Sequence, residues 1–313
     1  MTAPVQPNIV FDTDPGADDA LALIWLCAIA AQQRCAIHAL CAVGGNVGVR
    51  DTFDNAARLL RLCGRDDVPL ALGRDSGGEH ARHVHGADGL AGLRRTLAPA
   101  ARTAAAAPAA DALLAGLGRQ VPVPDALVAV GPLTNLSAAA ALDPQALARV
   151  PRIVVMGGAL GAGNVTPHAE FNAHHNAPAW AHALRAGRLD VVTLDQTRRV
   201  WFARDEVNTD SIEGPVGAFV GQLIRRMCAD GVKRSGQDRF FLHDAVAVAA
   251  ACYPQWVHFR DVALEVTETG EARGALREVP GAAPNARVAH EIDAPAIKSA
   301  LINDLVQLAA STQ

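Results

Sequence analysis

The sequence has 313 residues, half of them hydrophobic, which is enough apolar material to bury a large core in one or two domains. A formal net charge of -4, without any basic run, gives no electrostatic footprint for nucleic acid or for an anionic membrane surface. The longest uncharged apolar segment, 20–33, is too short to span a bilayer, and residues 1–8 lack the charged and apolar regions of a signal peptide. We therefore expect a cytoplasmic protein with no nucleic-acid or membrane partner.

The cysteines show neither a CxxC pair nor the spacing of zinc ligands. Most of them lie in apolar contexts, which is typical of buried free thiols in a reducing compartment. We expect the following residues to be small buried hydrophobic groups: Cys27, Cys35, Cys41, Cys63, Cys228 and Cys252.

Four aspartates directly follow the first predicted strand. That strand covers residues 8–11, the segment 12–19 reads DTDPGADD, and an apolar helix is predicted over 20–31. Pro15-Gly16 favours a tight turn, so the acids lie at the carboxyl end of a strand, the edge where parallel α/β sheets bind ligands. A bound cation is the simplest relief for such crowded charge, and hard carboxylate oxygens favour Ca²⁺ or Mg²⁺ over zinc.

The same acids also have a purely structural interpretation. Asp14 is a suitable N-cap, and Asp18 and Asp19 suit the positive end of the helix dipole. One or two such acids would need no further explanation. Four within eight residues favour the cation site.

Strands and helices alternate along the following part of the chain. A strand over 36–43 ends at Gly44-Gly45-Asn46, a helix covers 51–63, and a short strand covers 68–72. The glycine- and histidine-rich segment 73–89 is predicted to be a long loop that could act as a mobile lid. Of its three histidines, we expect His80 and His83 to be solvated, and we place His85 near a ligand.

The second half of the sequence continues this alternation, and we find no linker that divides residues 1–313 into separate domains. Polar residues again follow predicted strands, notably Asn164, Glu170 and Asn172 after the strand that ends at Met156. The predicted segments are a connector over 98–110 with a helix to 117, strands over 126–130 and 152–156, a helix over 177–186, a strand over 190–194, helical segments over 204–228, a mobile flap over 229–239, a helix over 243–252, strands over 262–266 and 287–292, and a helix over 295–309.

Residues far apart in sequence would meet at one rim of this predicted sheet. The rim offers carboxylates and a backbone carbonyl to a hard cation, and amides to a polyhydroxylated ligand such as a sugar. A metal-bound water beside an aspartate suits attack on an anomeric carbon. The rim residues are Asp14, Asp19, Asn46, the Val130 carbonyl, Asn164, Glu170, Asn172 and Asp244.

These residues give the sequence its resemblance to a known family. Residues 12–20, DTDPGADDA, are similar to the DxDPGxDDA motif of the inosine-uridine-preferring nucleoside hydrolases. Further matches follow in the expected order over nearly the whole chain, which makes the series much more specific than one glycine-rich motif. They are Gly45-Asn46, His85-Gly86, residues 131–135 (GPLTN), Met156-Gly157-Gly158, Gly163-Asn164, Glu170-Phe171-Asn172 and His243-Asp244.

The resemblance implies a fold and a ligand set. The fold would be a single α/β domain with a doubly wound, mostly parallel sheet, and its active site would hold one Ca²⁺. The implied ligands of this ion are Asp14, Asp19, the carbonyl of Val130 and Asp244. The family also suggests a homodimer or a homotetramer.

The resemblance further implies hydrolysis of the N-glycosidic bond of ribonucleosides to ribose and free base. Asp14 would be the general base that activates a metal-bound water for direct attack with inversion, and His243, near the base, would assist its departure. The remaining predicted site residues would hold the substrate, mainly through the ribose hydroxyls: Asp18, Asn46, His85, Asn164, Glu170 and Asn172.

Base preference stays open because the sequence departs from the family pattern. Ala245 stands where proline is usual after His-Asp, which affects backbone stiffness more than chemistry. The segment before it lacks tyrosine, so aromatic contacts that some members make with the base are absent or replaced. His243 favours the non-specific or pyrimidine-tolerant members, but it could also be a plain residue at a helix start with Asp244 as N-cap.

Two rival functions remain open on the sequence. Residues 11–14, FDTD, superficially fit the DxD start of a haloacid dehalogenase-type phosphatase, but Pro15-Gly16 follow where a small β-branched residue is needed, and only Lys233 and Lys298 could supply the lysine. The second rival is a non-catalytic nucleoside or sugar sensor on the same fold. The intact general base, Asp14, argues against it.

Overall fold

The computed structural model describes residues 6–311, except 77, 101, 120–122 and 208–211. Its centre is an eight-stranded sheet in the order β3-β2-β1-β4-β5-β6-β12-β9, in which only the β12–β9 pair is antiparallel. The strand order therefore reverses at β1, as a doubly wound sheet requires. The strands are β1 Asn8–Thr13, β2 Ala36–Ala42, β3 Leu70–Leu72, β4 Ala126–Ala129, β5 Ile153–Met156, β6 Leu189–Val192, β9 Val257–Val262 and β12 Ala286–Ile292.

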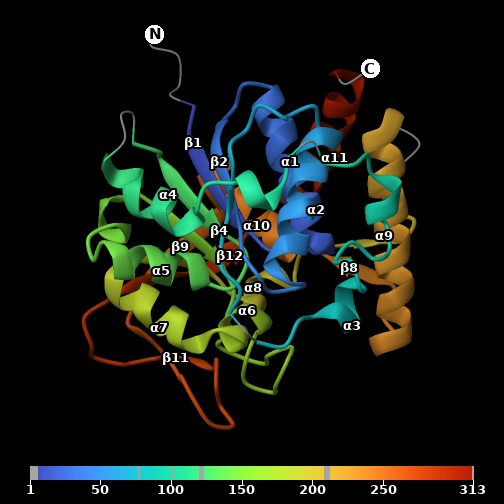
Figure 1. The fold of residues 1–313 in the computed structure, drawn as a ribbon. Coiled ribbons are helices and arrows are strands. Elements are labelled where there is room, and N and C mark those ends of the chain that lie inside the picture. The colour runs from blue at the N-terminus through green and yellow to red at the C-terminus, as the bar shows by residue number, and fades with distance from the viewer. Residues whose placement is uncertain (1–5, 77, 101, 120–122, 208–211, 312–313) are drawn as a thin grey trace.

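Helices cover both faces of the sheet (Figure 1). Successive side chains of a strand point to opposite faces, so Ile9 and Phe11 pack in one core and Val10 in the other. The first core lies under α1 Ala17–Ala31, α2 Val49–Leu62, α9 Gly214–Ser235, α10 His243–Cys252 and α11 Ala294–Ser311. The second lies under α4 Ala110–Gly116, α5 Thr134–Leu142 and α7 Ala177–Ala186.

Burial on both faces explains why the central strands are almost entirely apolar, and the one acid in them, Asp190 of β6, is paired with Arg152 and Arg287. Every residue of β4, β5 and β6 is buried, so no polar and apolar alternation appears in these strands. The predicted single α/β domain with a mostly parallel sheet is confirmed. Among the described residues, no helix is both long and apolar enough to cross a bilayer.

The predicted flap over 229–239 is wrong, because most of it is helical. Helix α9 continues to Ser235 and ends at Gly236 in the left-handed conformation, with φ of 71°. Strand β8 Arg239–Phe241 then pairs with β7 Trp201–Ala203. A Cβ on Gly231 would lie 2.7 Å from the Gln237 carbonyl oxygen, so this glycine permits close approach of the returning chain.

Other predicted boundaries shift by smaller amounts. The first helix begins at Ala17, three residues earlier than predicted, and the loop 73–89 contains the short helix α3 Arg82–His85. The predicted strand over 262–266 divides between β9 and β10 Leu264–Val266, and β10 pairs with β11 Leu276–Glu278 in a separate hairpin. The helical segment predicted over 204–228 includes 208–211, which lie outside the described residues.

Candidate active site

A cavity of about 870 Å³ opens at the carboxyl ends of the central strands. Loops after β2, β4 and β5 line it, as do the start of α1, the short helices α3 and α6 Phe171–His175 and the start of α10. The strand ends thus gather residues that are far apart in sequence, as the rim argument predicts. The predicted site residues that line the cavity are Asp18, Asp19, Asn46, His85, Val130, Asn164, Glu170, Asn172, His243 and Asp244.

Three carboxylates form the floor of the site. Asp18 and Asp19 at the start of α1 and Asp244 at the start of α10 each offer an oxygen, and these oxygens lie within 4.8 Å of one another. Burial, and then the charges of Asp18 and Asp19, raise the pKa of Asp244 well above its ordinary value of 3.8. Burial also raises the pKa of Asp18 to about 6. We call these three residues the carboxylate cluster.

Asp14 lies just outside the carboxylate cluster and is almost fully buried. Its Oδ2 accepts a hydrogen bond of 2.7 Å from the backbone N–H of Asn46, whereas its Oδ1 has no partner among the described residues. Burial and the neighbouring charge of Asp19 raise its pKa well above the ordinary value. A buried carboxylate oxygen without a partner is costly, so this atom is suited to a ligand or to a proton.

Two glycines permit the close approach of backbone to Asp14. A Cβ on Gly45 would lie 2.1 Å from Oδ2 of Asp14, and a Cβ on Gly131 would lie 2.6 Å from its Oδ1. Any larger residue at either position would displace the carboxylate. These contacts give a physical reason for the glycines in the Gly45-Asn46 and Gly131-Pro132 motifs.

The carboxylate of Asp19 organises the turn before α1. It accepts hydrogen bonds from the Thr13 hydroxyl at 2.7 Å, from the Gly16 N–H at 3.0 Å and, more weakly, from the Asp14 N–H at 3.2 Å. The side-chain amide of Asn46 donates a fourth bond at 3.0 Å. Asp19 therefore stabilises the start of the helix, as the structural interpretation expects, and also contributes to the carboxylate cluster.

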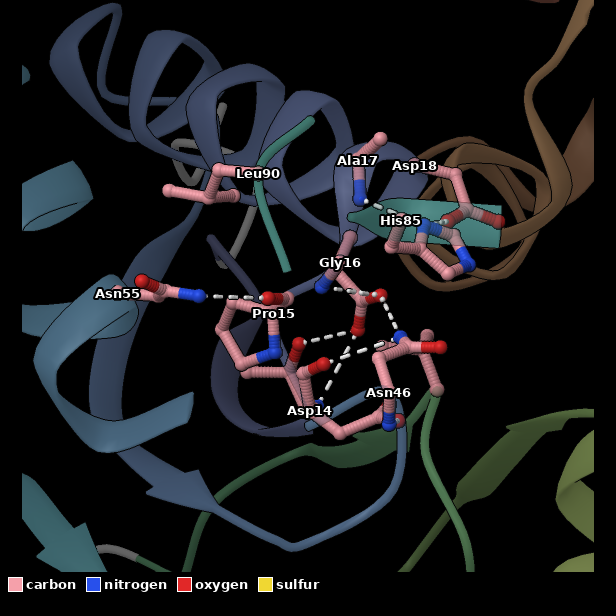
Figure 2. Close-up of polar contacts among 12 residues, drawn as sticks. Asp14, Pro15, Gly16, Ala17, Asp18, Asn46, Asn55, His85 and Leu90 are labelled. Carbon is pink, nitrogen blue, oxygen red and sulfur yellow. Dashed lines mark hydrogen bonds and ion pairs between the residues drawn. The ribbon is translucent and has the colours of Figure 1, made fainter. Parts of the chain in front are cut away.

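His85 faces the carboxylate cluster as a neutral ring (Figure 2). Its Nδ1 accepts a hydrogen bond of 3.1 Å from the backbone N–H of Ala17 and lies 3.9 Å from Oδ1 of Asp18. Because an amide N–H can only donate, the ring proton must be on Nε2. Burial lowers the pKa of His85 to about 4, so the ring is uncharged at neutral pH.

Asn55 fastens the His85 loop to the turn before α1, a contact that sequence reasoning missed (Figure 2). Its fully buried side-chain amide donates to the carbonyl of Pro15 at 3.1 Å and to that of Asp88 at 2.8 Å. Both acceptors are backbone atoms. No pattern of residue types in the sequence could have indicated them.

Glu170, Asn172 and Asn164 hold the opposite wall together. Glu170 caps α6 by accepting from the N–H groups of Asn172 and Ala173 at 2.9 and 3.1 Å, and it also accepts from that of Gly158 at 2.7 Å. The Asn172 side chain donates to the carbonyl of Val130 at 2.8 Å. Oδ1 of Asn164 accepts from the N–H at position 171 at 2.9 Å.

His243 lies at the start of α10 next to the carboxylate cluster. Its Nδ1 is 2.7 Å from the hydroxyl of Thr197, and its ring stacks on Phe241 with centroids 5.5 Å apart and planes 13° apart. Burial, and then the positive charge of Arg198, lower the pKa of His243 to about 3. The ring is therefore a neutral imidazole. No motif in the sequence singles out its partner Thr197.

The histidines of the 73–89 loop do not form a metal site of their own. In the part of the chain that the structure describes, the carboxylate cluster is the only group of at least three His, Cys, Asp or Glu side chains with ligand atoms this close together. Nδ1 of His80 lies 2.9 Å from the carbonyl of Gly45, and His83 lines the cavity. All six cysteines are free thiols, five of them buried.

Comparisons with known proteins agree with this geometry. Residues 9–299 match the family described as inosine-uridine preferring nucleoside hydrolase. The chain is 32% identical over 309 residues to the non-specific ribonucleoside hydrolase RihC of Salmonella paratyphi A, with 94% of this chain and 95% of the relative covered. It is 31% identical over 279 residues to the probable uridine nucleosidase 2 of Oryza sativa subsp. japonica, with coverage of 87% and 81%.

Solved structures show the same fold. The plant nucleoside hydrolase PpNRh1 superposes with a TM-score of 0.87 at 26% identity, covering 96% of this chain and 99% of its own. The purine-preferring ribonucleoside hydrolase from Gardnerella vaginalis superposes equally well with the same coverage, and at 22% identity it supports the fold alone. The ordered motifs, the match over residues 9–299 and these relatives together show that the chain belongs to the inosine-uridine preferring nucleoside hydrolase family.

Proposed function

We propose that this ribonucleoside hydrolase is calcium-dependent and that it cleaves the N-glycosidic bond by direct attack of water, with Asp14 as the general base. The observation that carries the proposal is the concentration of buried, mutually repelling carboxylates on the floor of one cavity. Their raised pKa values mean that the metal-free site binds protons in place of a missing positive charge. A divalent cation supplies that charge without blocking the carboxylate oxygens.

The donor set fits a hard cation of the calcium type. The available ligand atoms are the carboxylate oxygens of Asp19 and Asp244, the unpartnered Oδ1 of Asp14 and the carbonyl of Val130. All of them are oxygens, and Ca²⁺ accepts six to eight oxygen ligands in flexible geometries. The Val130 carbonyl already accepts one hydrogen bond, but it has a second lone pair.

The residues around the carboxylate cluster are suited to hold a ribose. Asp18 belongs to the cluster and accepts hydrogen bonds from ribose hydroxyls beside the ion. Asn172 and Asn46 have side-chain amides that line the same cavity, and Asn164 and Glu170 add further polar groups to its lining. When bound, Ca²⁺ supplies the positive charge that fixes the sugar diol and makes a neighbouring water more acidic.

Hydrolysis then requires one proton acceptor and one stabilised leaving group. Asp14 takes a proton from the attacking water as its oxygen bonds to the anomeric carbon. The C1′–N bond breaks, and its electron pair moves to the base beside His243. The ribosyl group is positively charged in the transition state, and the negative field of Glu170 and the aspartates stabilises it. No serine, cysteine or lysine nucleophile is needed, and attack from the opposite face inverts the anomeric centre.

We infer a broad base preference, with inosine, uridine and cytidine as first substrates. The relatives named above include a non-specific ribonucleoside hydrolase and a probable uridine nucleosidase. A cavity of about 870 Å³ lies in the upper part of the usual range for small-molecule sites. The assembly, a homodimer or a homotetramer, and the cytoplasmic location stay predictions, and light scattering of the purified protein tests the first of them.

A panel assay tests the proposal directly. Purine and pyrimidine nucleosides, ribo and deoxyribo, are incubated with the protein and calcium, and free base and ribose are measured. We expect ribonucleoside hydrolysis that chelation abolishes, and we expect Asp14→Asn to lose turnover much more than binding. An inactive calcium-loaded wild type would favour the non-catalytic sensor. Cleavage of phosphate esters instead would favour the phosphatase, which the family match does not support.

A further inference from the structure

Thr197 is the hydrogen-bonding partner of His243 behind the cavity. It is the last residue of the short helix α8 Leu194–Thr197, and it is fully buried. Its Oγ1 lies 2.7 Å from Nδ1 of His243, a normal distance for a strong neutral hydrogen bond. Distance alone does not say which group donates, because a hydroxyl can donate or accept and a neutral imidazole can carry its proton on either nitrogen.

The surroundings of Thr197 decide the direction of this bond. Among the residues that the structure describes, the contact with His243 is the only hydrogen bond of the Thr197 hydroxyl. The carbonyl of Thr193 accepts from the backbone N–H groups of Gln196 and Thr197. If Nδ1 of His243 carried the ring proton, the hydroxyl hydrogen of Thr197 would be buried without an acceptor, which is costly. The hydroxyl therefore donates to Nδ1, and the ring proton is on Nε2.

The ring plane is fixed by a second contact. His243 stacks nearly parallel on Phe241, so the ring cannot turn about its long axis without losing either the stacking or the bond to Thr197. His243 also lines the cavity. With Nδ1 occupied, Nε2–H is the hydrogen-bonding group that the ring has left to offer.

We propose that Thr197 is a positioning residue that holds the His243 ring with Nδ1 as acceptor, so that its Nε2–H donates a hydrogen bond to the departing base. The proposal rests on the proposed function for the identity of the acceptor. During cleavage the electron pair of the C1′–N bond moves to the base, whose acceptor atom gains negative charge and is stabilised by this N–H. His243 keeps its proton, Asp14 takes one from the attacking water, and solvent supplies the proton of the released base.

Replacement of Thr197 by valine tests this role with almost no change of shape. Thr197→Val should lower kcat for uridine or inosine by about 10- to 100-fold, because the ring loses its fixed tautomer. KM should change less than threefold. Hydrolysis of p-nitrophenyl riboside, whose leaving group needs no hydrogen bond, should also fall less than threefold. Thr197→Ser retains the hydroxyl and should restore nucleoside turnover.

Thr52→Val is the matched control for loss of a buried threonine hydrogen bond. Thr52 is also fully buried, and its hydroxyl donates to the carbonyl of Val43 at 2.8 Å. Its hydroxyl is not bonded to His243, so Thr52→Val should lower the stability of the protein and should change turnover of nucleosides and of p-nitrophenyl riboside by the same factor. Equal losses on both substrates for Thr197→Val, or a failure of Thr197→Ser to restore turnover, would overturn the proposal.

A nitrogen NMR spectrum of the histidines in the wild-type protein gives a test that needs no stable variant. We expect the His243 signals, assigned by their loss in a His243→Gln sample, to show a protonated Nε2 and an unprotonated Nδ1. The opposite tautomer would refute the inference even if the enzyme is active. A wild type with calcium that cleaves neither nucleosides nor p-nitrophenyl riboside would instead refute the proposed function, and the spectrum would still decide the Thr197–His243 arrangement.

Discussion

Replacing Asp244 by asparagine should stabilise the metal-free protein, although it removes a proposed ligand. The oxygens of the carboxylate cluster lie within 4.8 Å of one another. With an effective dielectric constant near 20, two full charges at that distance repel by about 3.5 kcal/mol, so the two neighbours of Asp244 together cost about 7 kcal/mol. The asparagine has nearly the same shape and carries no charge, so it relieves this repulsion.

Protonation limits the size of this gain. A carboxyl group with an ordinary pKa of 3.8 can be protonated at pH 7 at a cost of about 4 kcal/mol. Because this is less than the full repulsion, the metal-free cluster holds a proton, and about 4 kcal/mol is the upper limit for what the asparagine can gain. For a chain of this length, that limit corresponds to a rise in Tm of about 6 °C.

Calorimetry with a chelator and then with calcium measures the effect. We expect Asp244→Asn to have a higher Tm than the wild type in chelator, and a lower Tm in saturating calcium, because binding to the folded state stabilises the wild type more. Asp190→Asn is the control. Asp190 is equally buried but is paired with Arg152 and Arg287, so its variant should be destabilised in both conditions. A lower Tm for Asp244→Asn in chelator would refute the reasoning.

Three further predictions follow from the site. Burial raises the pKa of Asp12 to about 7, so between about pH 6 and 8 the folded chain loses a proton that the unfolded chain does not hold. The histidines titrate equally in wild type and Asp12→Asn, so in urea titrations with chelator the wild type should lose stability relative to this variant as the pH rises. Gly45→Ala displaces Asp14 and should lower kcat about 100-fold, whereas Gly116→Ala, in open space, should not. His243→Ala should slow nucleosides more than p-nitrophenyl riboside in parallel assays.

The arrangement of the fold could be predicted because its signals are local. The central parallel strands β4 and β5 are buried on both faces and are therefore short apolar runs, and the helices of the first core pack apolar residues on the sheet. The prediction of a flap was wrong because a glycine can indicate either a flexible segment or a close contact between two stretches of backbone. Gly231 lies inside α9 and serves close contact with the chain that returns at Gln237, and only the three-dimensional structure separates that role from flexibility.

That most of the predicted residues would gather around one cavity could also be predicted, since most of them follow strand ends, but their contacts could not. Asn55 acts on two backbone carbonyls, and Thr197 acts on a histidine that is 46 residues away. Side-chain hydroxyls and amides are common in helices, and the residues next to them in sequence do not reveal which groups they hydrogen-bond. Contacts of this kind therefore require side-chain directions, which periodicity does not supply.

Hydrogen bonding separates acids that stabilise the fold from acids that are left for a ligand. Glu170 receives three backbone N–H groups, and the carboxylate of Asp19 receives four donors in all. Asp14 instead keeps one buried oxygen without a partner among the described residues. Because a stable fold gains nothing from an unpaired buried carboxylate, this oxygen is better explained by what binds there than by what it does for folding. Asp19 belongs to both groups, since it accepts hydrogen bonds in the turn and is also part of the carboxylate cluster. An ion bound at the proposed site would therefore be coupled to the start of α1.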